Sequence, residues 1–254
     1  MSDRALVVEQ YRTADNLRAR IALHERFSTS LVSYPRWVFD GYEFAADAEV
    51  LEVGCGDGNI WRENIDRIPA GWQLTLTDLS PTMVDEAHAA LGERARYAVA
   101  DVEALQFADA SFDAVIANHM LFHVDDRALA LSEIARVLRP HGAFRATTIG
   151  RGHLRELREL APPRDELWLK TRERFTSESA AQELAPFFED VELEPYPDSL
   201  EVSEVEPLVA FVRSRGDVGE EELAAVRRAA AATIEACGAF HVTKETSRVR
   251  ARKP

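Results

Sequence analysis

The sequence predicts an α/β fold in which helices cover both faces of a doubly wound, mainly parallel sheet. Three observations predict it. A strand, a glycine-rich turn and a helix start follow one another at 50–61, strand and helix patterns alternate through 50–150, and several of the strands end on an acidic or amide residue. Such alternation is typical of parallel sheets with crossover helices. The 254 residues, 46% of them hydrophobic, suffice for one domain with an elaboration.

Charge and cysteine content narrow the class of partner. Lys plus Arg number 30 against 44 for Asp plus Glu, a net charge of −14 that would repel nucleic-acid phosphates and anionic lipid. Cys55 and Cys237 are the two cysteines, which favours a reducing cytosol over a disulfide scaffold. No long apolar run or signal-like amino end is evident. We therefore expect a cytoplasmic protein with a small-molecule partner, and neither a nucleic-acid nor a membrane partner.

The amino-terminal segment, 1–45, reads as helical. Apolar residues recur at three- and four-residue steps from Val7 to Phe27, which predicts one amphipathic helix, and Pro35 can begin a second, short one. Tyr11 and His24 are the polar members of the apolar face. Hydrogen-bonded core roles explain both more simply, but Tyr11 is also a candidate for contacting a substrate.

The cofactor-binding core, expected at 46–150, begins with the glycine turn. A short apolar strand at 50–53, interrupted by the acidic Glu52, is followed by three alternating glycines, Gly54, Gly56 and Gly58. A helix expected to carry apolar residues as far as Ile68 comes next. Glycine lets a backbone approach a ligand that a Cβ would exclude, and a helix amino end presents unpaired N–H groups. The turn therefore predicts a polar ligand.

The ends of the next strands give that ligand a chemical identity. Strands are expected at 74–78, 96–101, 112–118 and 143–149, and ligands of open α/β sheets lie beyond the carboxyl ends of the strands. Those ends carry Glu52, Asp78, Asp101 and Asn118. An acid about twenty residues past a glycine turn can accept both hydroxyls of a ribose, and a carboxylate beside a backbone amide can read an exocyclic amine. A nucleoside site is implied.

Five motifs in chain order resemble one family. They are Glu-Val-Gly-Cys-Gly-Asp-Gly at 52–58, Asp-Leu-Ser-Pro-Thr-Met at 78–83, Ala-Asp-Val-Glu at 100–103, Phe-Asp-Ala-Val at 112–115 and Glu-Ile-Ala-Arg-Val-Leu-Arg-Pro-His-Gly at 133–142. Together they resemble class I S-adenosylmethionine-dependent methyltransferases of the small-molecule type. The resemblance implies a Rossmann-like methyltransferase fold with a seven-stranded sheet, S-adenosylmethionine as cofactor, and methyl transfer to O, N or C of a small organic acceptor, with S-adenosylhomocysteine as product.

The resemblance also implies roles for individual residues. Around the methionyl group it places Glu52, Gly54, Cys55, Gly56, Gly58 and Asn118; at the ribose, Asp78; at the adenine, Leu79, Met83, Asp101 and Val102. His119 to His123 would face the acceptor.

His123 is the candidate general base, because a near-neutral imidazole suits proton abstraction; a buried histidine that fixes its loop explains it equally well. His119 and His123, four residues apart, are weak evidence for a metal, and we expect no metal site.

Alternatives on the same fold remain. A nicotinamide-dependent oxidoreductase would space its glycines as G-x-G-x-x-G, whereas Asn59 stands at the third glycine position. A phosphate-binding NTPase would need Gly-Lys-Ser/Thr after the loop, and methyltransferases that act on nucleic-acid amines resemble one another in prolines that Asn118 to Leu121 lack. A non-catalytic nucleoside-binding protein stays open as a different class of function.

The last third predicts a cap and the rest of the sheet. Helices expected at 153–160 and 177–188 would make 151–190 a helical cap insertion over the acceptor side. In 191–254 we expect a strand at 191–194, a helix from 202, an alanine-rich helix at 220–236 and closing strands at 240–244 and 249–252. The chain, 1–254, is treated as a single domain. Acceptor identity and oligomeric state have no signal in the sequence.

Overall fold

The computed structural model describes residues 14–162 and 174–254, with side chains from residue 21. The first described helix is α2 (Ala14–Phe27), the later part of the predicted amino-terminal helix. Tyr11, the tentative substrate contact, lies outside the described residues.

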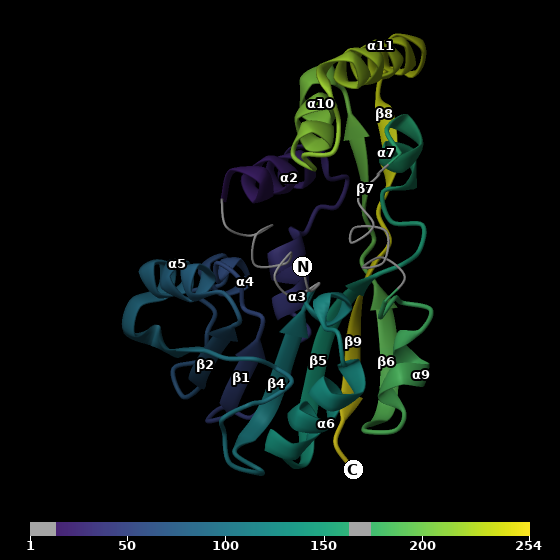
Figure 1. Ribbon diagram of the computed structural model, residues 1–254. Coiled ribbons are helices and arrows are strands. Elements are labelled where there is room, and N and C mark those ends of the chain that lie inside the picture. The colour runs from purple at the N-terminus through teal and green to yellow at the C-terminus, as the bar shows by residue number, and fades with distance from the viewer. Residues whose placement is uncertain (1–13, 163–173) are drawn as a thin grey trace.

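A seven-stranded sheet forms the base of the molecule (Figure 1). Its strands are β1 (Glu49–Val53), β2 (Gln73–Asp78), β3 (Ala95–Val99), β4 (Phe112–Asn118), β5 (Leu138–Ile149), β6 (Glu189–Pro195) and β9 (Thr246–Arg252). They lie in the order β3-β2-β1-β4-β5-β9-β6, and only β9 among them runs antiparallel to its neighbours β5 and β6. The predicted doubly wound, mainly parallel, seven-stranded sheet is confirmed.

Successive side chains of a strand point to opposite faces of the sheet, and here the residues on both faces are buried. Leu51 of β1 and Val115 of β4 pack with α6 (Arg127–Val137) and α9 (Ala180–Leu184) on one face. Val50 and Ile116 pack on the other face with α3 (Tyr34–Phe39), α4 (Asn59–Arg62) and α5 (Pro81–Leu91). Both faces are therefore covered, which explains the continuous apolar runs of the central strands.

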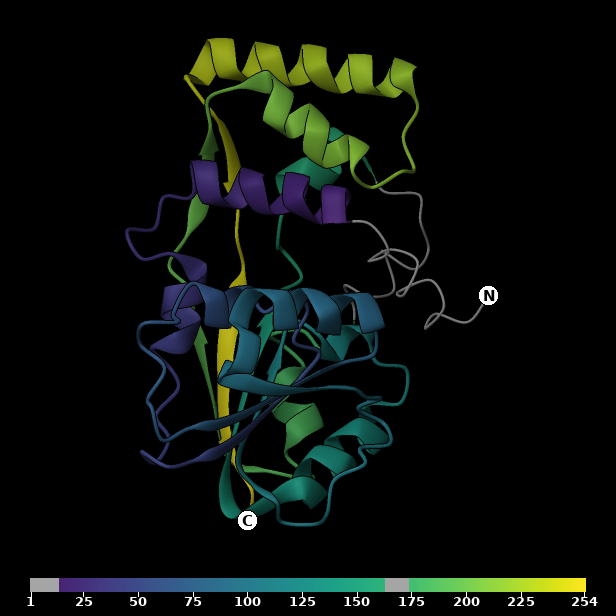
Figure 2. The same ribbon diagram turned by 90° about the vertical axis from the view of Figure 1, so that its left-hand side faces the viewer.

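A second, smaller body stands over the carboxyl ends of the parallel strands (Figures 1 and 2). It combines α2 with α7 (Arg155–Leu160), α10 (Val205–Arg213), α11 (Glu220–Cys237) and the two-stranded ribbon of β7 (Ser199–Val202) and β8 (Phe240–Thr243). We call this body the cap. Its buried core includes Leu23, Leu157, Leu208 and Val242, from segments spread over the whole chain.

The cap differs in composition from the one expected at 151–190. Among the described residues of that stretch, α7 and the residues beside it join the cap core, whereas α9 and Phe188 pack on the sheet. The segment at 240–244, expected to close the sheet, pairs instead with β7, a strand that we did not predict. The reason is burial: Leu200, Val202 and Val242 point into the cap core with exposed residues between them.

The helix after the glycine turn is also shorter than predicted. It is the four-residue α4, and the chain then turns. The Asn64 side chain donates to the Ile60 carbonyl at 2.8 Å and to the Pro35 carbonyl at 3.0 Å. Such hydrogen bonds from a side chain to nearby backbone compete with continuation of the helix. The prediction from the helical spacing of Ile65 and Ile68, that the helix continues to Ile68, was therefore wrong. In the described part of the chain, no helix combines the length and apolarity that crossing a membrane needs.

Candidate functional site

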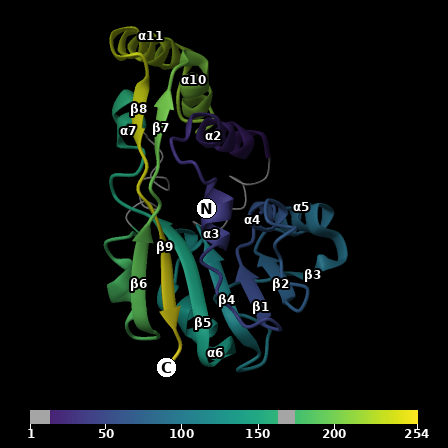
Figure 3. The ribbon, with the colours of Figure 1, turned by 180° about the vertical axis from the view of Figure 1, so that it is seen from behind.

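A cavity of about 510 Å³ lies between the carboxyl ends of the strands and the cap. Its walls come from the glycine turn, the ends of β2, β3 and β4, helix α2, and the residues that link β8 to β9. Seen from behind, α2 lies above α4 and α5 with the strand ends below (Figure 3). All the cofactor-binding candidates line this cavity except Gly58.

The glycine turn shows why two of its glycines are needed. Gly54 and Gly56 have φ of 68° and 55°, in the left-handed region that side chains disfavour. A Cβ on Gly54 would lie 2.7 Å from the Met120 Cβ, whereas a Cβ on Gly56 would meet no atom within 4 Å. Gly54 therefore permits close packing and Gly56 borders open space. Gly58 does not line the cavity, and a Cβ on it would lie 3.3 Å from the Cβ of Ala87 in α5.

Asp78 and Asp101 are oriented by backbone amides at the strand ends. Asp78 accepts from the Gly56 amide at 3.0 Å and from the Ser80 amide at 2.8 Å; burial raises its pKa despite these bonds. Asp101 accepts from the Glu103 amide at 3.0 Å. A carboxylate has about four acceptor positions, so Asp78 keeps acceptor capacity toward the cavity, which Asp101 also lines.

Leu79, Met83 and Val102 border the same part of the cavity as the two aspartates. They supply apolar surface there, whereas the aspartates supply acceptors. Apolar walls with a few placed polar groups are typical of small-molecule sites.

The buried Glu52 and the half-buried Asn118 form a polar pair that lines the cavity. The Glu52 carboxylate accepts from the Trp61 indole N–H and from Asn118 Nδ2, the latter at 2.9 Å. Asn118 Nδ2 also donates to the Tyr42 hydroxyl at 2.7 Å. Burial raises the pKa of Glu52 to about 7. The buried Asn118 Oδ1 has no hydrogen-bond partner among the described residues, so it is an acceptor for a ligand N–H.

Histidines gather at the other end of the cavity. His119 follows β4 at φ 48°, and its amide donates to the carbonyl and the hydroxyl of Thr147 at 3.1 Å each. His123 lies in the short helix η2 (Leu121–His123). Burial, with a smaller contribution from Lys244, lowers the pKa of His119 to about 4 and that of His24 to about 3. These two imidazoles are therefore neutral at pH 7.

Several lining residues were missed as site residues. Tyr34, His153, Lys244 and Thr246 line the cavity, and His24 joins them although its sequence position favoured a core role. Lys244 had one available signal, a lysine at the end of a predicted closing strand. No group of three His, Cys, Asp or Glu residues suited to a metal occurs in the described ranges.

The arrangement can hold two ligands next to each other. One end offers carboxylate and amide acceptors on a rigid sheet, and the other offers neutral imidazoles and an ammonium under the cap. A site of this type suits transfer of a group between a bound nucleoside and a second molecule, since positioning two reactants in a partly closed cavity is itself a large part of catalysis.

Comparison with known proteins agrees with this geometry. Residues 51–146 match the family model described as a methyltransferase domain. Over 115 residues the chain is 38% identical to a malonyl-[acyl-carrier protein] O-methyltransferase of Pseudescherichia vulneris, covering 44% of this chain and 43% of that protein. The chain thus spans less than half the length of this curated relative.

Solved structures share the fold over most of the chain. A putative methyltransferase from Bacillus halodurans superposes with a TM-score of 0.62 at 16% identity, covering 88% of this chain and 100% of that one. A Haemonchus contortus phosphoethanolamine N-methyltransferase, in complex with phosphomonomethylethanolamine and S-adenosylhomocysteine, has a TM-score of 0.55 at 18% identity, covering 87% and 52%. At these identities the likeness shows the fold alone.

Proposed function

We propose that this protein transfers a methyl group from S-adenosylmethionine to a small organic acceptor, and that residues 51–146, which match the methyltransferase-domain model, hold a cofactor site of the class I type. One observation carries the proposal: a single cavity is lined by Gly56, which borders open space, by Asp78 and Asp101, and by Asn118 with its unsatisfied Oδ1. These groups fit a nucleoside that carries an amino acid.

The residues present match the chemistry of that cofactor. Asp78 has free acceptor positions for ribose hydroxyls, and Asp101 beside the Val102 amide offers an acceptor and a donor to a purine edge. Glu52 and the Asn118 Oδ1 offer acceptors to an ammonium group. When bound, S-adenosylmethionine supplies a methyl group on a positively charged sulfur, which is open to in-line attack.

The protein's own contribution is then orientation, exclusion of water and, where needed, removal of a proton. The cap covers the strand ends, so an acceptor bound between them is shielded from solvent. His123 and His119 both line the cavity, and His123 is the candidate base. A base is required only if the acceptor atom must lose a proton.

The acceptor is proposed to be a small molecule, free or carried on a protein. The net charge of −14 supports this over nucleic acid, and the same composition supports a cytoplasmic location. The curated relative is described as acting on a malonyl group of an acyl-carrier protein, so carrier-bound acyl groups belong in the acceptor screen.

Calorimetry is the first test of the proposed function. S-adenosylmethionine and S-adenosylhomocysteine are expected to bind at micromolar concentrations, and Asp78→Ala is expected to weaken both by about tenfold or more, because hydrogen bonds to a charged group are lost. Glu63→Ala, at an exposed position beyond α4, is the matched control. Binding of NAD(H) with no binding of either sulfur nucleoside would support the oxidoreductase alternative instead.

A second assay separates an enzyme from a binding protein. Formation of S-adenosylhomocysteine is followed with a panel of carboxylates, phenols, amines and acyl-carrier thioesters. Turnover with one acceptor class is the expected result. Tight cofactor binding without turnover on any of them would favour the non-catalytic nucleoside-binding alternative.

A further inference from the structure

Lys244 lines the cavity beside β9, which β4 and β5 separate from β1 and the glycine turn that follows it. This residue links β8 to β9 and lines the cavity, yet its side chain is only 6% exposed. Its ammonium pairs with Asp198, whose side chain is 0% exposed and does not line the cavity. The two charges therefore lie in different positions: the ammonium borders the cavity and the carboxylate is behind it.

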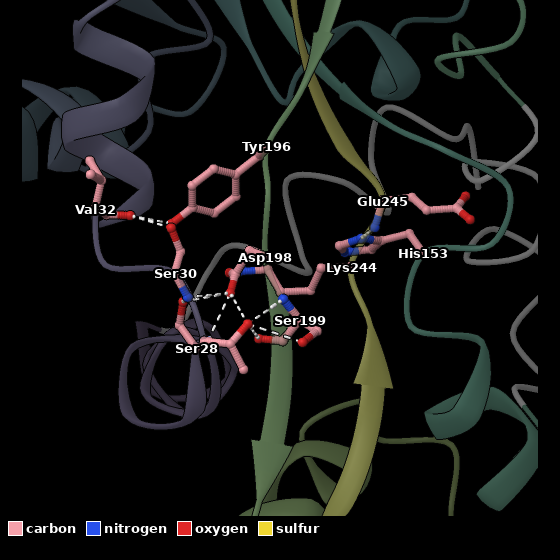
Figure 4. Close-up of polar contacts among 10 residues, drawn as sticks. Ser28, Ser30, Val32, His153, Tyr196, Asp198, Ser199, Lys244 and Glu245 are labelled. Atoms are coloured by element: carbon pink, nitrogen blue, oxygen red, sulfur yellow. Dashed lines mark hydrogen bonds and ion pairs between the residues drawn. The ribbon is translucent and has the colours of Figure 1, made fainter.

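Asp198 is satisfied by groups on the side away from the cavity (Figure 4). Its Oδ1 accepts from the Ser28 hydroxyl at 2.7 Å and from the amides of Thr29 and Ser30 at 3.0 and 3.1 Å, while Oδ2 receives Lys244. Burial by itself would raise the pKa of Asp198, but the hydrogen bonds from Lys244 and Ser28 outweigh this effect. The net pKa of Asp198 is therefore lowered, and the carboxylate is ionised. Much of its negative charge is thus compensated by the residue 28–30 loop rather than by Lys244 alone.

Lys244 retains donor capacity toward the cavity. An ammonium has three N–H donors, and Asp198 is its one side-chain acceptor among the described contacts. The Tyr196 ring lies 5.2 Å from Nζ and stabilises the cation without accepting a conventional hydrogen bond. Among the described residues that line the cavity, Lys244 is the one lysine or arginine.

Two histidines that line the cavity together with Lys244 are uncharged. His24 and His119 are neutral at pH 7, as their lowered pKa values require. The Nδ1 atom of His24 is buried and has no hydrogen-bond partner among the described residues. An N–H at this atom could donate to the same ligand group as Lys244. By contrast, Asp78 ends β2 and Asp101 follows β3, and these two strands lie on the other side of β1 from β9.

We propose that this end of the cavity binds a carboxylate of the methyl acceptor, through the ammonium of Lys244 and the imidazole of His24. The inference rests on the proposed function, because it assigns the ligand at this end to the acceptor. One ammonium with a neutral donor beside it matches a singly charged carboxylate better than a doubly charged phosphate, for which bidentate arginines are the more common partners. The proposed carboxylate site does not depend on which atom of the acceptor receives the methyl group.

The test compares matched probes on the protein saturated with S-adenosylhomocysteine. Hexanoate, hexanamide and hexyl phosphate are titrated and followed by ligand-observed NMR. The wild-type protein is expected to bind hexanoate at least about tenfold more tightly than hexanamide, since a buried charge-assisted hydrogen bond is worth about 1.5–3 kcal/mol. Lys244→Met is expected to bring this ratio close to one.

Two further variants separate binding from folding. Lys244→Met with Asp198→Asn removes both charges and leaves no unpaired buried carboxylate, and it should lose the preference in the same way. Lys253→Met removes a partly buried lysine outside the cavity, whose Nζ donates to the Leu138 carbonyl, and should keep the preference. The affinity of each variant for S-adenosylhomocysteine, measured first, reports whether the cofactor end is intact.

Three results would overturn the inference: equal binding of hexanoate and hexanamide by the wild type, an unchanged ratio in both Lys244 variants, or tighter binding of hexyl phosphate than of hexanoate. Failure of the wild-type protein to bind S-adenosylhomocysteine is a different result. It would overturn the proposed function, whereas the probe ratio could still be measured on the protein without nucleoside.

Discussion

At the residue scale, the buried Glu52 shows how position changes the chemistry of a common side chain. Its carboxylate lies beneath the glycine turn and accepts from Trp61 and Asn118, yet burial raises its pKa from the ordinary 4.5 to about 7. The folded protein therefore binds more protons at this group than the unfolded chain between these two values. The stabilising contribution of protonated Glu52 is complete below pH 4.5 and is lost as the pH rises through 7.

The raised pKa of Glu52 makes the free energy of unfolding depend on pH in a measurable way. Between pH 4.5 and 8, the loss at Glu52 amounts to about 3 kcal/mol in the free energy of unfolding. Glu52→Gln cannot ionise, so its free energy of unfolding is expected to rise relative to that of the wild type by about this amount between pH 4.5 and 8. The loss of one acceptor adds a cost that is the same at every pH. Urea unfolding at several pH values measures both, with the exposed Glu63→Gln as control. Parallel curves for wild type and Glu52→Gln would contradict the raised pKa.

His123 is the residue whose proposed role depends most on the acceptor. If the acceptor loses a proton to it, His123→Ala is expected to lower kcat by about 10²–10⁴-fold, while the affinity for S-adenosylhomocysteine stays within about twofold. His88→Ala, an exposed histidine on α5 outside the cavity, is the control. Steady-state turnover with the identified acceptor measures the effect. Normal turnover in His123→Ala would assign the histidine a structural role.

At the element scale, the glycine turn combines two different requirements that substitution can separate. Gly54→Ala combines left-handed strain with a collision against Met120, so it is expected to cost clearly more stability than strain alone. Gly56→Ala meets open space and is expected to cost about 1–2 kcal/mol, but its methyl group would occupy part of the cavity and weaken S-adenosylhomocysteine binding.

Gly216 provides a matched control for Gly56. It has φ +78° and a Cβ there would also meet no atom within 4 Å, but it lies between α10 and α11, away from the cavity. Gly216→Ala is expected to lose a similar amount of stability and to keep full nucleoside affinity. Urea unfolding and calorimetry on the three variants measure both quantities. Equal nucleoside affinity in Gly56→Ala and Gly216→Ala would place the ligand elsewhere.

At the scale of the whole molecule, the cavity joins two bodies with separate apolar cores. The sheet contributes the glycine turn and the acidic strand ends, and the cap contributes α2 with His24. We therefore expect ligands to protect the two bodies separately in hydrogen exchange.

S-adenosylhomocysteine alone should slow exchange at 54–58 and 78–83 by up to about tenfold at ten times its Kd, and addition of hexanoate should extend this protection to 24–30. Mass spectrometry of peptic peptides measures both steps. Peptides of α11, which is distant from the cavity, serve as the internal control. Protection of 24–30 by the nucleoside alone, with no further change on adding hexanoate, would contradict this division.

Much of the fold was predictable because its signals are local. The central strands are apolar on both faces and end on polar residues, and β4 was predicted at its observed bounds, 112–118. The glycine turn, Asp78, Asp101 and Asn118 follow from the rule that ligands lie at the carboxyl ends of parallel strands, and the structure brings them to one cavity. The exception was α4, where the Asn64 side chain ended a helix that the apolar spacing favoured.

The opposite end of the cavity was not predictable in the same way. Lys244, His153 and His24 are far apart in the chain and belong to no shared motif. They meet because the chain crosses from cap to sheet at residues 243–246, and because α2 packs on α10 and on the β7 ribbon.

By itself, then, the sequence determined the parallel sheet, the glycine turn and the acidic strand ends, since each depends on residues a few positions apart and on a fixed periodicity. Only the tertiary structure decided which segments build the cap, that β8 leaves the sheet to pair with β7, and that Lys244 borders the cavity while Asp198 lies behind it. The physical reason is that the apolar face of a helix or strand determines which side chains must be buried, but does not determine which other element buries them. That choice depends on packing between distant parts of the chain.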